Sequence, residues 1–217
     1  MLELLQKGGP LMWLILLCSV VALGVFLERL LHLHKASIRV GELLGGLSLQ
    51  IRNGRLDEAL GEASSAPGPV ARVLQAALLH PHEGREVLQS VTRDAALLEI
   101  PSLERNLPIL STLAYLTPLI GLLGTVLGLL DAFLVLSSHG GYATAAELSR
   151  GVYQSLLDAA AGLGVAIPAL VGHAYLSSRV NDIIQDMERA GIEVVNLLSD
   201  TRQQDTVGAV GAGEKEA

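Results

Sequence analysis

The chain has 217 residues, of which half are hydrophobic and only 17% are charged. Its mean hydropathy is positive, and this composition is unusual for a soluble domain and typical of a membrane protein with a modest aqueous part. The net charge of −7 argues against nucleic acid as a partner, and the single cysteine, Cys18, excludes an intrachain disulfide.

Residues 1–29 are predicted to hold a short lead-in and a first transmembrane helix. The run from Leu11 to Leu27 is apolar, and Glu28 follows it. A cleaved signal peptide is the alternative interpretation. Against it, Glu3 precedes the run together with Lys7, and no small-residue cleavage site closes the run. We therefore predict a retained helix.

Residues 30–108 are predicted to form a cytoplasmic helical region. Apolar residues recur there at helical spacing, and turn-forming residues such as Asn53-Gly54, the sequence SSAPGP and Pro81 separate the helices. The last helix is expected to run nearly straight into the next span, with a kink at Pro101 as the alternative. The four predicted helices are Ile38–Ile51, Arg55–Ala63, Val70–Leu79 and Glu83–Asn106.

Residues 109–136 form the second predicted span, because a bilayer crossing needs about 20 apolar residues. A stripe of small residues, Gly121, Gly124 and Gly128 with Thr125, lies in its middle. Such a stripe lets helix backbones approach closely in lipid. Asp131 places a carboxyl group in this apolar segment. The free-energy cost of inserting such a group is about 2.5–3.5 kcal/mol near the centre of a membrane helix and less toward an end. We therefore expect Asp131 to face protein or water.

Residues 137–149 are predicted to form a polar hairpin, and residues 150–176 the third span. This span has its own small-residue stripe and a proline, Pro168, that is expected to bend it or loosen its hydrogen bonds. Gln154 and Asp158 are four residues apart, so they share a helix face. Residues 177–200 are amphipathic and are predicted to continue as a cytoplasmic helix, and residues 201–217 are predicted to be disordered.

The distribution of basic residues predicts the orientation. Lys and Arg are frequent between Arg29 and Arg105 and absent from the stretch between the second and third spans. Cytoplasmic loops carry the excess of basic residues. The N-terminus and the hairpin are therefore expected on the side of the membrane opposite to the cytoplasm, and the C-terminus in the cytoplasm.

No nucleophile–base pair, phosphate-binding loop or metal-ligand spacing occurs, so we predict no enzyme, no metal and no cofactor. Polar residues of the spans stand out instead. An antiparallel hairpin of the last two spans would place Asp131 near Gln154 and Thr125 near Ala159. We expect Thr125, Asp131 and Asp158 to line an ion path or a subunit interface. For Thr112 and Thr117 the favoured alternative is a hydrogen bond to their own helix backbone.

Two stretches resemble the MotA/TolQ/ExbB proton-channel family, in its three-span ExbB/TolQ branch. They are TPLIGLLGTVLGLLDAF, residues 117–133, and GVYQSLLDAAAGLGVAIPA, residues 151–169. The resemblance implies an all-α, three-span protein of the bacterial inner membrane that forms a homopentamer around a central pore. It implies as partners a single-span ExbD/TolR-like subunit, a TonB/TolA-like protein and membrane lipids. The implied function is conversion of proton motive force into mechanical work.

The resemblance also assigns residues. Thr125 matches the pore-facing threonine of the second span. The usual glutamate of the third span falls at Gln154 and its usual threonine at Ala159, so our hypothesis is that Asp158 replaces the missing carboxyl group. The predicted ion pathway is Thr125, Asp158, Gln154, Asp131, Ser155 and Ala159, and the predicted packing residues are Gly121, Gly124, Gly128, Gly162, Pro118 and Pro168.

Three other functions stay open at this point. The alternatives are a non-conducting membrane scaffold for a partner helix, a divergent gliding or secretion motor subunit, and a flagellar stator subunit. The stator branch normally has four spans, which ranks that alternative low.

Overall fold

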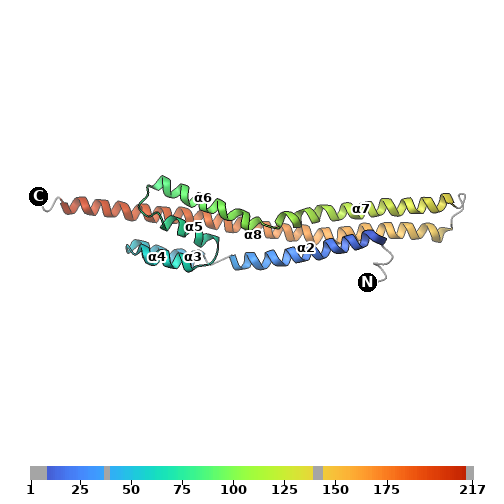
Figure 1. Ribbon diagram of the computed structural model, residues 1–217, viewed down its shortest axis with the longest axis horizontal. Helices are drawn as coiled ribbons and strands as arrows, with labels where there is room; N and C mark the ends of the chain where they lie inside the picture. Colours follow the sequence, from blue (N-terminus) through green and yellow to red (C-terminus); the bar gives the residue numbers. More distant parts are fainter. Residues whose placement is uncertain (1–8, 37–39, 139–143, 214–217) are drawn as a thin grey trace. The chain divides into compact units, whose positions relative to one another are not determined.

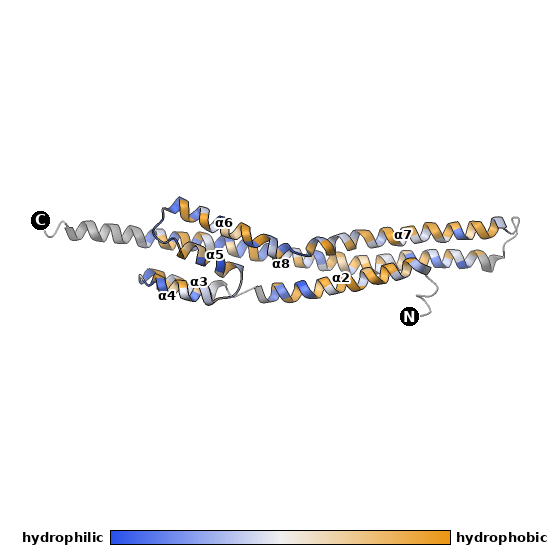
Figure 2. Ribbon diagram, viewed as in Figure 1, coloured by the Kyte–Doolittle hydropathy of each residue, from blue (hydrophilic) through white to orange (hydrophobic). Residues whose placement is uncertain are grey.

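The computed structural model describes residues 9–36, 40–138 and 144–213, and all of their regular structure is α-helix. Three of its helices are long and apolar enough to cross a membrane. The prediction of an all-α chain with three spans is therefore confirmed for these residues. Figure 2 shows the apolar character along α2 (Gly9–Ala36) and α7 (Leu107–Ser138). The chain divides into two compact units.

The first unit contains α2 up to Leu30, α7, and the first part of α8 (Ala145–Gly213). Small residues let these helices pack closely. A Cβ placed on Gly172 of α8 would lie 2.9 Å from the ring of Phe26 on α2. Ile15 and Cys18 of α2 form a buried cluster with Ile120 of α7. In Figure 1, α7 and α8 run side by side in this unit.

The second unit contains four shorter helices and the part of α8 from Ser178 onward. The helices are α3 (Val40–Arg52), α4 (Leu56–Ser65), α5 (Pro69–Leu78) and α6 (Arg85–Glu104). Gly54, with φ +74°, makes the turn between α3 and α4, and Gly68, with φ +109°, precedes Pro69 at the start of α5. Both positions favour glycine, and proline suits the first turn of a helix. The turn residues of the sequence therefore mark the helix ends.

Apolar side chains from all of these helices fill the core of the second unit. Fully buried members are Leu47, Ile51, Leu74, Leu88, Met187 and Val194. On its surface, the guanidinium of Arg72 donates two hydrogen bonds to the carboxylate of Glu99, at 2.6 and 2.5 Å. These hydrogen bonds raise the pKa of Arg72 above its ordinary value, against the opposing effect of partial burial. In a second contact between helices, the guanidinium of Arg85 on α6 donates a hydrogen bond to the side-chain oxygen of Asn196 on α8 at 2.7 Å.

Two features of the chain differ from the sequence predictions. The helix expected to run straight from residue 83 into the second span is interrupted at Arg105 and Asn106, where Asn106 has φ +65°. Pro101 stays inside α6. The expectation of one nearly straight helix was therefore wrong, because a left-handed asparagine ends α6 and a new helix starts at Leu107.

The end of the chain is the second difference. Disorder was predicted from residue 201, but α8 continues to Gly213. No proline occurs after Pro168, so nothing in the sequence blocks the backbone hydrogen bonds of this helix. Residues 214–217, and residues 139–143 of the predicted hairpin, lie outside the described residues.

Candidate functional site

The closest packing in the first unit joins α7 to α8 through a row of glycines. Gly121, Gly124 and Gly128 are buried on α7. A Cβ on Gly128 would lie 2.9 Å from Cβ of Ser155, and one on Gly121 would lie 3.3 Å from Cα of Gly162. Side chains larger than hydrogen therefore do not fit, and the two antiparallel helices meet backbone to backbone.

Asp158 lies inside this contact. Its side chain is 2% exposed, and its Oδ1 atom has no hydrogen-bond partner among the described residues. A Cβ on Gly124 would lie 2.6 Å from Cβ of Asp158 and 2.7 Å from its Oδ2. The carboxyl group of Asp158 thus occupies the space that a side chain at position 124 would fill.

Hydroxyl groups on the same two helices donate hydrogen bonds to their own backbone. Ser155 is buried and donates to the Val152 carbonyl at 2.8 Å. Thr125 is half-buried and donates to the Leu122 carbonyl at 2.6 Å. Thr117 is fully buried and donates to the Leu113 carbonyl. Thr112 donates to the Pro108 carbonyl at 2.8 Å. Each hydroxyl oxygen keeps lone pairs that can accept a hydrogen bond or coordinate a cation.

The remaining predicted site residues lie in different surroundings. Gln154 contacts α2, because a Cβ on Gly9 would lie 2.6 Å from its Nε2 atom. Gln154 and Asp158 therefore contact two different helices, although they are one turn apart. Asp131 is exposed on α7, Ala159 is half-buried, and the Cα of Ala159 would lie 3.2 Å from a Cβ on Gly121. Of the two prolines, Pro118 is half-buried and Pro168 is exposed.

One buried charged group was not singled out from the sequence. Arg29, near the end of α2, is fully buried and forms an ion pair with Glu28 at 2.8 Å. Glu28 also accepts a hydrogen bond from the side-chain nitrogen of Asn106 at 2.9 Å. The signal in the sequence was the adjacent Glu-Arg at the end of the first apolar run. The contact with Asn106, 78 residues away, needed the tertiary structure.

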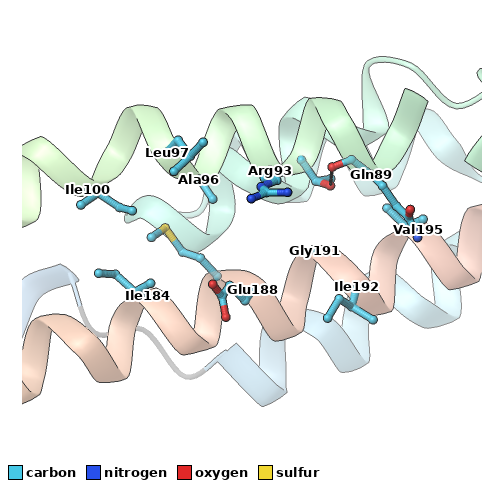
Figure 3. Close-up of a pocket in the computed structure, with 12 residues that line it drawn as sticks. Gln89, Arg93, Ala96, Leu97, Ile100, Ile184, Glu188, Gly191, Ile192 and Val195 are labelled. Carbon is cyan, nitrogen blue, oxygen red and sulfur yellow. Dashed lines mark hydrogen bonds between the residues drawn. The ribbon is translucent and has the colours of Figure 1, made fainter. Parts of the chain in front are cut away.

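A groove of about 370 Å³ lies between α6 and α8 in the second unit. Figure 3 shows its walls, with Ala96, Leu97 and Ile100 on α6 and Ile184 and Ile192 on α8. None of the predicted ion-pathway residues lines it. The buried polar groups between α7 and α8 are therefore the stronger candidate site.

Comparison with known proteins identifies the family. A sequence profile of the MotA/TolQ/ExbB proton channel family matches residues 65–189, which include all of α7 and Asp158. The chain belongs to the MotA/TolQ/ExbB proton channel family. Among relatives within this family, the chain is 29% identical to biopolymer transport protein exbB1 of Vibrio cholerae over 202 residues, 90% of this chain and 86% of the relative.

Two further relatives support membership of the MotA/TolQ/ExbB family. An ExbB homolog of Methanothermobacter thermautotrophicus is 26% identical over 216 residues, 96% of this chain and 76% of that protein. The Tol-Pal system protein TolQ of Haemophilus influenzae is 46% identical over 88 residues, 41% of this chain and 38% of TolQ. With three long apolar helices among its described residues, this member of the family is a multi-pass membrane protein.

Proposed function

We propose that this chain is the channel subunit of a proton-driven motor in the bacterial inner membrane. It forms a homopentamer around a pore that houses an ExbD/TolR-like single-span partner. Proton flow through this assembly drives mechanical work on a TonB/TolA-like protein. The N-terminus lies in the periplasm and the C-terminus in the cytoplasm.

One observation supports this proposal most strongly. The part of the chain that matches the proton channel family contains two apolar helices with buried Thr117, Ser155 and Asp158 at their contact. Polar groups inside a membrane are unfavourable unless they face protein or water, and they often mark ion paths. Half-buried Thr125, one residue after Gly124, lies at the same level of α7 as Asp158 of α8.

The test is proton uptake by vesicles that contain the full chain together with an ExbD/TolR-like single-span protein. Thr125→Val removes one hydrogen-bonding hydroxyl while keeping the side-chain shape. A single hydrogen bond contributes about 0.5–1.5 kcal/mol, so we expect uptake to fall about two- to tenfold. Thr112→Val is the matched control, because the exposed Thr112 also donates only to its own helix. Its uptake is expected to match the unaltered chain.

Two results would contradict this proposal. Unchanged uptake in Thr125→Val would exclude a pore-facing role for that residue. Absence of partner-dependent uptake in the unaltered chain would favour the non-conducting scaffold.

A further inference from the structure

The groove between α6 and α8 changes in character along its length. At the end nearer the C-terminus of α6 its walls are Ile100 and Ile184, and at the other end they include Val195 (Figure 3). Arg93 of α6 and Glu188 of α8 line the groove between these ends. Within the described residues, neither of these two side chains forms an ion pair or a hydrogen bond. The groove is therefore apolar, then charged, then apolar again.

A second strip of apolar residues lies on the opposite flank of α6. Val87, Val91, Asp94 and Leu98 are spaced by three or four residues, so they share one helix face. At 3.6 residues per turn, this face lies roughly 160° around α6 from the residues that line the groove. Leu98 is 80% exposed and Val87 is 46% exposed. We call these four residues the α6 ridge.

The α6 ridge and the groove carry matching groups in the same order. The ridge has Leu98 toward the C-terminal end of α6, the acidic Asp94 next, and valines beyond it. The groove has Ile100, then the basic Arg93, then Val195. Arg93 and Asp94 are adjacent in sequence, so they differ in height along α6 by about 1.5 Å. The two surfaces therefore match in apolar character, in charge and in register.

Two different surfaces on opposite flanks of one helix suit a head-to-tail contact between identical chains. In a two-fold symmetric contact the same surface meets itself, which would bring Asp94 toward the Asp94 of the partner subunit. In a head-to-tail ring, equivalent residues lie at the same level along the axis. Where α6 runs along that axis, Asp94 of one copy lies level with Arg93 of the partner subunit. Such a contact also covers the exposed Leu98 and Leu97, and exposed apolar patches commonly mark interaction sites.

We propose that the α6 ridge of one copy packs into the groove between α6 and α8 of the next copy. Leu98 fills the end of the groove formed by Ile100 and Ile184, and Asp94 pairs with Arg93 of the partner subunit. This inference rests on the proposed homopentamer, and it names the surface of the second unit through which the copies meet.

The first test is disulfide cross-linking of the purified full chain with copper phenanthroline. One chain carries both Leu98→Cys, on the ridge, and Ile184→Cys, in the groove. The single native cysteine, Cys18, is buried and stays in every variant. A head-to-tail contact joins each ridge to the next groove, so we expect a ladder of covalent multimers that reductant collapses. Each single-cysteine variant should give no ladder, because a ridge does not meet another ridge.

The matched control pairs Ile184→Cys with Leu49→Cys. Leu49 is 66% exposed and lies on α3, outside the ridge, so this chain should stay monomeric on a denaturing gel. Three results would overturn the proposal. The ridge and groove cysteines give no ladder, as expected if another protein or lipid fills the groove; the Leu49 control gives an equal ladder; or Leu98→Cys alone cross-links as readily as the pair.

The second test exchanges the two charges in the same cross-linking background. Arg93→Asp places two acidic groups at the contact and Asp94→Arg places two basic groups there. Exposed charge pairs contribute about 0.2–1 kcal/mol, so each single change should slow cross-linking about two- to fivefold. The double exchange restores an attractive pair and should restore the rate. Equal rates in all four chains, or a double exchange slower than both single changes, would contradict the pairing.

A failed ladder and a failed motor are told apart by two further measurements on the unaltered chain, its mass in micelles and its partner-dependent proton uptake. A multimer that takes up protons but gives no ladder would mean that the copies meet through other surfaces, and only this inference would fall. A monomer without proton uptake would remove the proposed function as well.

Discussion

Replacing Gly121 by alanine tests the contact on which the candidate site depends. The new methyl carbon would lie 2.8 Å from the Asp158 carbonyl oxygen, 3.2 Å from Ala159 Cα and 3.3 Å from Gly162 Cα. These are backbone atoms, so no side-chain rotation relieves the overlap. Ordinary carbon contacts are about 3.5–4.0 Å, and α7 and α8 must therefore separate by roughly 0.5–1 Å. Overpacking of this kind destabilises by about 1–3 kcal/mol.

Gly164→Ala is the control for this change. A Cβ at Gly164 of α8 would meet no atom within 4 Å. Both variants gain the same helix propensity, about 0.8–1.0 kcal/mol, so their difference isolates the contact. We expect Gly121→Ala to be about 1–3 kcal/mol less stable than Gly164→Ala, roughly a 5- to 150-fold difference in the ratio of folded to unfolded chain.

The assay is reversible unfolding of the full chain in mixed micelles, titrated with dodecyl sulfate and followed by the fluorescence of Trp13, the only tryptophan. Equal stability of Gly121→Ala and Gly164→Ala would refute the close backbone contact between α7 and α8.

Two further predictions concern the break before α7 and the surface of the second unit. Asn106 has φ +65°, a conformation that alanine adopts less readily than glycine. Asn106→Ala should therefore unfold at a lower denaturant concentration than Asn106→Gly, with a free energy of unfolding that is smaller by up to about 1 kcal/mol. The reverse order would contradict the assigned backbone conformation. The ion pair of Arg72 and Glu99 is 55% and 17% exposed at its two side chains. A double-mutant cycle with alanine should give a coupling of about 0.2–1 kcal/mol that shrinks in molar salt, and a coupling that salt leaves unchanged would be inconsistent with so exposed an arginine.

The site itself was only partly predictable from the sequence. The glycines and Asp158 stood out because small and acidic residues are conspicuous in apolar segments, and a hairpin of the last two spans placed them at similar depth. The residue that each of these side chains contacts could not be predicted from the sequence. Gln154 and Asp158 are one turn apart, yet Gln154 contacts Gly9 on α2 and Asp158 contacts Gly124 on α7. A rotation of the helix by a fraction of a turn exchanges such partners, and local sequence does not fix that rotation.

The sequence by itself determined that the chain is helical, that three of its segments are long and apolar enough to span a membrane, and where turn residues such as Gly54 and Gly68 separate the shorter helices. These properties depend on neighbours within one or two turns of the chain. Only the tertiary structure decided that Asp158 fills the space left by Gly124, that Glu28 accepts a hydrogen bond from Asn106, and that the helix breaks at Asn106 rather than at Pro101. Those outcomes depend on the register between segments far apart in the chain, which is set by packing and not by local propensity.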